Sequence, residues 1–184
     1  MNKKIYLSPS MQSNNISLDF EMLKNEITKH DNSIKQIFLC KKMKSGLKKN
    51  SDYVVYVFNM IGYVFKSMYY LATSKVCITE SYCVPISILK HKKNLKIIQI
   101  WHASGAVKKF GYQILDKKEG KSSEVAKLMC MHKNYDYAIA PSEVTKEIFS
   151  EAFNMKKEKI VKLGLPRLEY ISNEKYDKSN EIYN

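Results

Sequence analysis

The chain has 184 residues, which is enough for one well-buried domain, and it is 45% hydrophobic and 27% charged, as ordinary globular proteins are. Lysine and arginine number 31 against 18 acidic residues, and the net charge of +13 predicts attraction to an anionic partner: nucleic acid, an acidic membrane surface or a phosphorylated substrate. Charge does not choose among these partners, and a lysine-rich surface with no partner explains the excess equally well.

The four cysteines exclude a disulfide framework. They contain no C-x-x-C pair and lie in or near apolar runs, at positions 40, 77, 83 and 130. We therefore expect reduced thiols of a cytosolic protein and no metal site. The first nine residues hold too few apolar side chains for a signal peptide.

Short apolar, β-branched runs alternate with helical patterns along the chain. The runs predict strands at residues 4–7, 34–40, 75–79, 97–101, 135–140 and 158–163. Between them, apolar residues at helical spacing or capping residues predict helices at 14–29, 53–72, 85–89, 122–132 and 141–153. This alternation predicts an α/β fold, a Rossmann-like parallel sheet with helices on both faces.

The run at residues 53–72 allows three interpretations. It is almost long enough to span a bilayer, but Asn59, Gly62, Lys66 and Ser67 interrupt it and several tyrosines dilute it. A buried core helix is the first expectation, a helix on a membrane surface the second and a spanning helix the third.

The stretch from 97 to 111 carries the main candidate site. A strand leads into His102, then into the small residues Ala103, Ser104 and Gly105, where a ligand can approach the backbone closely. We expect a helix to begin next, with Lys108 and Lys109 and free N–H groups favouring an anion. A histidine can exchange protons near neutral pH, so its place beside an anion site favours phosphate chemistry.

Two further strand ends add polar groups at the same predicted edge. Ser142 follows one strand, and Gly164 with Arg167 follows the next, so Arg167 offers a planar fork of donors to a phosphate. A surface ion pair is the alternative for Arg167. Trp101 is expected to be a wall or core residue, and the remaining histidines, His30, His91 and His132, are expected at the surface.

Four motifs in order give the chain a resemblance to a known family. They are WHASGAVKKFG (101–111), DYAIAPS (136–142), the phenylalanines of the helix after it (Phe149 and Phe153) and GLPR (164–167). Together they resemble the CDP-glycerol glycerophosphotransferases of teichoic acid synthesis, over residues 96–171. The family's last motif usually has Asp two positions on, where this chain has Glu169.

The resemblance implies an enzyme that transfers glycerol phosphate from CDP-glycerol to a hydroxyl of an anionic lipid-linked acceptor, releasing CMP. It implies His102 as general base, and substrate or phosphate binding by Ser104, Gly105, Lys108, Lys109, Ser142, Gly164 and Arg167. It implies no cofactor beyond the donor substrate, and a peripheral place on the cytoplasmic face of the plasma membrane.

The same resemblance implies a two-domain GT-B architecture. Residues 1–171 are expected to form its amino-terminal, acceptor-side domain, and residues 172–184 to begin a linker to a donor-binding domain that this chain lacks or meets as a separate half. Ribitol phosphate is an alternative cargo, and a non-catalytic module that binds anionic membrane is an alternative class. Scattered lysines without a basic helix or a base-stacking sheet argue against nucleic acid.

Overall fold

The computed structural model describes residues 3–8, 15–40, 50–103, 106, 108–170 and 172. Six strands form one sheet in the order β2-β1-β3-β4-β5-β6, and every neighbouring pair is parallel. The strands are β1 (Lys4–Ser8), β2 (Lys35–Phe38), β3 (Val76–Thr79), β4 (Lys96–Gln99), β5 (Tyr137–Ala140) and β6 (Ile160–Lys162). All six predicted strands are confirmed, with ends that differ by a few residues.

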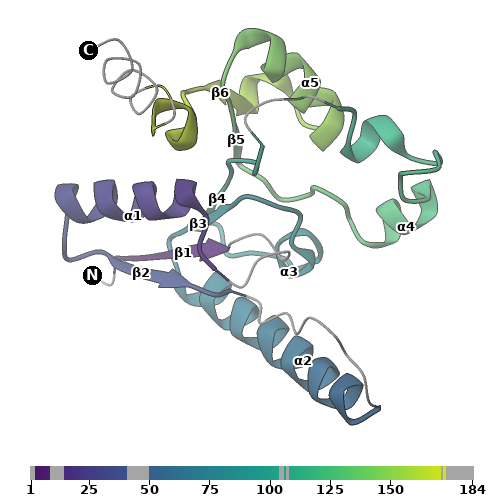
Figure 1. Cartoon of the computed structure of the whole chain (residues 1–184), viewed down its shortest axis with the longest axis horizontal. Helices are drawn as coiled ribbons and strands as arrows, with labels where there is room; N and C mark the ends of the chain where they lie inside the picture. The colour runs from purple at the N-terminus through teal and green to yellow at the C-terminus, as the bar shows by residue number, and fades with distance from the viewer. Residues whose placement is uncertain are drawn as a thin grey trace, which may run out of the picture.

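Helical elements connect successive strands (Figure 1). They are α1 (Leu18–His30), α2 (Asn50–Thr73), α3 (Val84–Ile88), η1 (Gly111–Ile114), α4 (Ser123–Leu128), α5 (Glu143–Phe153) and η2 (Lys157–Lys159), followed by a helical turn at 166–170. From β1 the chain adds β2 on one side and the later strands, beginning with β3, on the other, so the order reverses between β1 and β3. Ligands of open parallel sheets bind beyond the carboxyl ends of the strands at such a reversal.

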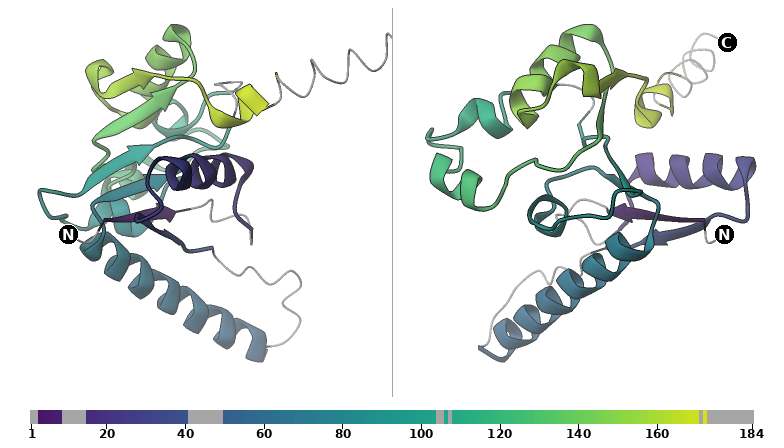
Figure 2. Two further views of the ribbon diagram at one scale, coloured as in Figure 1. Left: turned by 90° about the vertical axis from the view of Figure 1, so that its left-hand side faces the viewer. Right: turned by 180° about the vertical axis from the view of Figure 1, so that it is seen from behind.

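The two faces of the sheet are covered by different helices, as the turned views in Figure 2 show. On one face α1 packs Phe20 against Leu7, Ile78 and Ile100. On the other face α2, α3 and α5 enclose a larger core that is rich in aromatic and small side chains. Adjacent residues of β1 serve opposite faces, since Tyr6 belongs to the larger core and Leu7 to the smaller one. This is the period of two expected of strands covered on both sides.

The long helix α2 corrects the first expectation for residues 53–72, because much of it is not buried. Its contacts with the core come from its second half, where Tyr63, Ser67 and Leu71 lie four residues apart and are at most 6% exposed. The first half carries exposed Val54, Phe58 and Ile61 and extends beyond the carboxyl ends of β1 and β2 (Figure 1). Among the helices in the described ranges, none is both long and apolar enough to cross a membrane.

Two predicted helices also differ. The helix expected at 122–132 ends with α4 at Leu128, because positive φ angles at Cys130, His132 and Asn134 turn the chain back toward the core. The helix start expected near Lys108 is not present in residue 106 or residues 108–110, and a four-residue 3-10 helix, η1, follows instead. The predicted anion site thus does not rest on a helix start in these residues, and binding by Lys108 and Lys109 stays a prediction.

Candidate functional site

The turn after β4 presents His102 at the carboxyl edge of the sheet. Trp101 has a φ of 58°, a left-handed conformation that is uncommon for a bulky side chain. Its N–H donates to Oε1 of the fully buried Gln99 at 3.0 Å, and its indole stacks on Phe110 with ring centroids 4.2 Å apart. Trp101 is thus the wall residue that the sequence predicts, and it turns the chain so that His102 is exposed.

His102 is fixed through its ring and its backbone. Nδ1 lies 3.1 Å from the carbonyl oxygen of Glu80, which directly follows β3. The ring also lies against Trp101, with centroids 4.2 Å apart. The carbonyl oxygen of His102 accepts a hydrogen bond from Nη1 of Arg167 at 2.6 Å. Since a carbonyl can only accept, Nδ1 carries a proton and Nε2 of the neutral ring is left with a lone pair.

Arg167 is paired inside the protein. Its backbone N–H donates to Oδ1 of Asp19 at 2.9 Å, its Nε donates to Oδ2 at 2.5 Å, and its Nη2 forms an ion pair with the same oxygen. The Asp19 side chain is 2% exposed and that of Arg167 is 22% exposed. The guanidinium therefore joins α1 to the His102 turn, and its predicted binding of a phosphate stays a prediction.

A second buried carboxylate lies beside this pair. Glu80 is 1% exposed, and its Oε2 accepts a hydrogen bond from the Ser17 hydroxyl at 2.6 Å. Ser17 is also the N-cap of α1, because its Oγ accepts the N–H of Phe20 at 3.3 Å. The start of α1 is thus hydrogen-bonded to the end of β3 through Glu80, and its Asp19 pairs with Arg167 of the turn 166–170.

The other predicted site residues are only partly brought together. Ser142 caps α5 by accepting the N–H of Thr145 at 3.1 Å, directly after β5. Gly164 follows β6, and no atom would lie within 4 Å of a Cβ there, so its position is open. Ser142 follows β5, which pairs with β4, whereas Gly164 and Arg167 follow β6, on the other side of β5. Ser104 and Gly105 lie outside the described residues.

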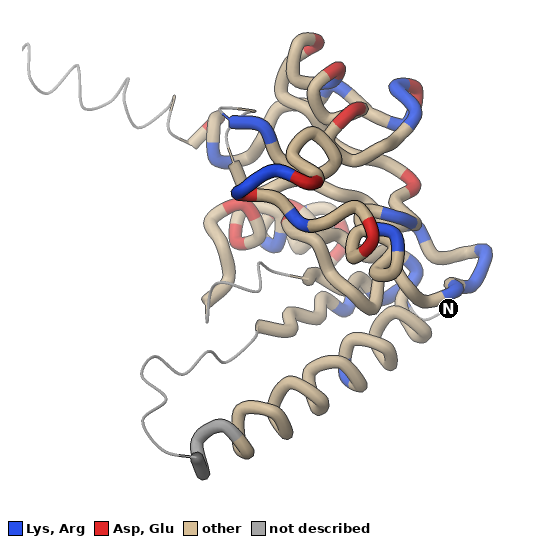
Figure 3. Tube along the Cα trace, turned by 90° about the vertical axis from the view of Figure 1, so that its right-hand side faces the viewer, with Lys and Arg blue, Asp and Glu red and all other residues tan. Residues whose placement is uncertain are grey.

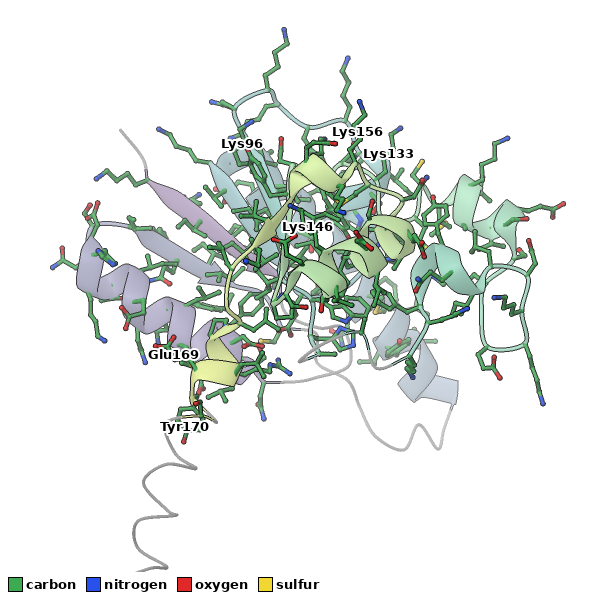
Figure 4. The ribbon with its side chains drawn as sticks, turned by 90° about the horizontal axis from the view of Figure 1, so that it is seen from above. Lys96, Lys133, Lys146, Lys156, Glu169 and Tyr170 are labelled. Carbon is green, nitrogen blue, oxygen red and sulfur yellow. The ribbon has the colours of Figure 1, made fainter. Side chains whose placement is uncertain are left out.

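For the two lysines of the predicted anion site, phosphate binding stays a prediction. Both are exposed, and Lys109 lines a shallow pocket with Tyr112, Gln113 and Glu151. Other lysines gather where strands begin, such as Lys96 of β4, Lys133 before β5 and Lys156 before β6. Figure 4 shows these three on one side of the domain, away from Glu169 and Tyr170. These three lysines thus lie near the amino-terminal ends of the strands, away from the carboxyl edge.

Three residues of this region escaped sequence analysis or were misjudged. Asp19 and Glu80 acquire their roles from partners 148 and 63 positions away, and no local pattern marks them. His132 was expected at the surface, but it is 6% exposed. Its wrong placement follows from the turn at 130–134 that ends α4 early. Burial also lowers the pKa of His132 to about 4.

A profile of the CDP-Glycerol:Poly(glycerophosphate) glycerophosphotransferase family matches residues 1–184. The chain belongs to this family. It is 39% identical over 145 residues to a teichoic acid ribitol-phosphate primase of Bacillus spizizenii, covering 79% of this chain and 36% of that protein. It is 33% identical over 104 residues to a teichoic acid glycerol-phosphate primase of Bacillus subtilis, covering 56% of this chain and 27% of that protein.

Solved structures of a family member share the fold. The wall teichoic acid polymerase TagF superposes with a TM-score of 0.67 at 19% identity, over 97% of this chain and 42% of that one. The likeness confirms the expected fold class, a Rossmann-like half of a GT-B architecture. The chain spans well under half of the length of these glycerophosphotransferase relatives.

Proposed function

We propose that this chain takes part in transferring glycerol phosphate from CDP-glycerol to a hydroxyl of a lipid-linked acceptor in teichoic acid or related cell-surface polymer synthesis, with His102 as general base. The observation that carries the proposal is the contact of His102 Nδ1 with the Glu80 carbonyl, because a proton held on Nδ1 leaves the lone pair of Nε2 for the acceptor hydroxyl. Family membership supports the choice of reaction.

In this mechanism Nε2 of His102 takes the proton of the acceptor hydroxyl. The oxygen forms a bond to the phosphorus that bears glycerol, and the bond from this phosphorus to the bridging oxygen breaks, so that CMP leaves. A positioned base contributes about 10²–10⁴-fold to such reactions. The proposed scheme uses no cofactor, and much of the remaining acceleration comes from orientation and charge stabilisation.

Arg167 and Glu80 position the base in this scheme. The Arg167 guanidinium fixes the His102 carbonyl, and the Glu80 carbonyl fixes the ring tautomer. Our candidates for phosphate binding remain those of the sequence analysis. They are the backbone around residues 104 and 105, the lysines at 108 and 109, and the strand ends at Ser142 and Gly164. A donor-binding second half, in the same polypeptide or separate, completes the site.

CDP-ribitol is a second candidate donor, because a relative at 39% identity is a ribitol-phosphate primase. The chain's likeness to glycerol-phosphate primases is lower, at 33% in Bacillus subtilis. A direct competition between the two donors, followed by release of CMP, decides the polyol.

We further propose that the protein lies on the cytoplasmic face of the plasma membrane and contacts it through α2. Between Val54 and Thr73 the only charged residue is Lys66, and the α2 tube in Figure 3 is correspondingly almost free of blue and red. The exposed stripe, defined as Val54, Phe58, Ile61, Phe65 and Tyr69, has the apolar and aromatic character of helices that lie in a bilayer surface.

The proposed activity is tested with radiolabelled CDP-glycerol, a prenyl-linked acceptor and the whole translated protein, once the DNA beyond codon 184 has been read. Label transferred to the acceptor with stoichiometric CMP supports the enzyme. Binding to acceptor or vesicles without transfer, under conditions where a primase of the family is active, identifies a non-catalytic module instead.

A further inference from the structure

A cavity of about 310 Å³ opens beside His102. Tyr82, Trp101, Phe110 and Ile114 give it largely apolar walls, and His102 and His132 are its imidazole groups. Its size is at the lower end of the range for ligand pockets, about 300–1,000 Å³. A hydroxyl that reaches Nε2 of His102 thus brings the adjoining part of its molecule to the mouth of this cavity.

A chain of hydrogen bonds fixes the orientation of the groups behind the cavity. The backbone N–H of Trp101 can only donate, so the atom of Gln99 that it meets at 3.0 Å is the carbonyl oxygen Oε1. The other end of that amide, Nε2, therefore donates, and it lies 3.2 Å from the hydroxyl of Tyr135. Gln99 is fully buried and Tyr135 is 3% exposed, so no solvent competes for these bonds.

The same chain favours one tautomer of His132, which the NMR experiment below tests. The Tyr135 oxygen accepts from Gln99, so its own proton is free for Nδ1 of His132, which lies 3.3 Å away. Burial raises the pKa of Tyr135, which keeps that proton in place, and burial keeps His132 neutral. A neutral imidazole that accepts at Nδ1 carries its proton on Nε2.

His132 Nε2–H is therefore a donor at the cavity. A methyl group at Gly111, another cavity residue, would approach Nε2 to 3.4 Å. The hydrogen bond of the His132 ring to Tyr135 is made by Nδ1, so it does not use Nε2. The residue as a whole is 6% exposed, and a donor in the wall of a cavity gains a hydrogen bond when a ligand or water supplies an acceptor.

The rim indicates the charge of the ligand. Lys121 lies there with Nζ 4.7 Å from the centroid of the Tyr82 ring, and Glu119 is another lining residue. One cation and one anion at the mouth favour a neutral guest over a phosphate. Aromatic walls suit the C–H face of a carbohydrate, and a single N–H suits one of its oxygens.

We propose that this cavity binds a neutral polyol or sugar group of the acceptor, next to the hydroxyl that reacts, and that His132 Nε2–H donates a hydrogen bond to one of its oxygens. The proposal rests on the proposed function, because it takes His102 as the base that the hydroxyl must reach. His132 acts as a binding residue, held in the required tautomer by Tyr135 and Gln99.

The direct test is NMR of the full chain labelled with ¹⁵N-histidine. The imidazole spectrum should show His132 protonated at Nε2, and titration with glycerol, ribitol or methyl glucopyranoside should shift its signals saturably. His30 and His91, outside the cavity, are internal controls and should not move. A proton on Nδ1, an absence of saturable shifts with all three probes, or a response to inorganic phosphate alone overturns the proposal.

Matched variants test the donor itself. H132Q keeps an N–H near the position of Nε2, whereas H132L removes it at similar volume, so H132L should weaken binding of the polyol probes about tenfold and H132Q much less. If H132L does not fold, Y135F serves, because loss of its hydroxyl should produce mixed His132 tautomers and weaker binding. Equal binding by the wild type and the folded variant contradicts the proposed donor.

Failure of this inference is distinguishable from failure of the proposed function. The H102A variant should lose transfer while His132 keeps its proton on Nε2. If transfer depends on His102 but no polyol binds at His132, only the proposal for the cavity is refuted. If the polyols bind at His132 but H102A transfers as well as the wild type, only the assignment of His102 as the base is refuted.

Discussion

Arg167 and Asp19 form an ion pair across 148 positions of sequence, and the pair supports the backbone of the residue proposed as the base. Asp19 is almost fully buried, so removal of Arg167 leaves a carboxylate without its cation. We predict that R167A lowers the free energy of unfolding by about 3 kcal/mol. Chemical denaturation measures this change.

The matched control is the pair of Lys157 and Glu147, whose side chains are largely exposed at 2.5 Å separation. K157A should leave the denaturation midpoint nearly unchanged, because water and salt screen exposed pairs. Equal losses in R167A and K157A would show that burial of the Asp19 pair contributes nothing.

Gly111 and Gly164 should respond oppositely to alanine. Gly111 has a φ of 58°, and a Cβ there would lie 2.1 Å from the carbonyl oxygen of Ala152. We predict that G111A costs about 2–4 kcal/mol of stability, measured by denaturation. G164A should be nearly neutral, because nothing lies within 4 Å of its added methyl. If folded G164A nevertheless loses transfer, the added methyl group blocks the approach of a ligand to residue 164.

The imidazole of His132 predicts a pH dependence of stability. Burial lowers its pKa from 6.5 to about 4, with Lys121 adding to the effect. The unfolded chain therefore takes up a proton between these values before the native protein does. Stability is fully present above pH 6.5 and falls by up to about 3 kcal/mol as the pH drops to 4.

Denaturation curves of the wild type and H132Q between pH 4 and 8 check this expectation. The difference between the two proteins isolates His132 from the carboxylates that also titrate at low pH. The difference in free energy of unfolding between the wild type and H132Q should become smaller as the pH falls from 6.5 to 4. A difference in unfolding free energy that stays constant from pH 4 to 8 would show that His132 titrates alike in the folded and unfolded states.

The exposed stripe of α2 should carry vesicle binding. Phe58 and Phe65 are 68% and 65% exposed, so serine at either position should leave stability unchanged. Loss of one phenylalanine from a bilayer should weaken binding about tenfold or more. Sedimentation with anionic vesicles measures this, and V144S is the control, since Val144 is 72% exposed on α5. Unchanged sedimentation of F58S and F65S would exclude α2 as the contact.

Much of the fold could be predicted because strand and helix signals are local. The six apolar runs and the turn residues between them define a parallel sheet, and the end of β4 identifies His102. Length and hydrophobicity could not place α2, since residues 53–72 suit a buried or a surface helix equally. Tertiary packing decides this, because the buried side chains among the described residues of that helix are Tyr63, Ser67 and Leu71.

The candidate site was less predictable because its groups meet only in the folded chain. Asp19 sits in the first turn of α1 like any acidic residue near a helix start, and only the turn at 166–170 gives it a cation. Arg167 looked free to bind a phosphate for the same reason. His132 was misplaced because left-handed residues in a polar run give no apolar signal of burial.

The central claim is that Nε2 of His102 removes the proton of the acceptor hydroxyl, and transfer by H102A tests it most directly. The side chain is exposed, so the variant should unfold within about 0.5 kcal/mol of the wild type. Transfer of labelled glycerol phosphate by the whole translated protein should then fall by about 10²–10⁴-fold. Undiminished transfer by folded H102A would contradict the claim.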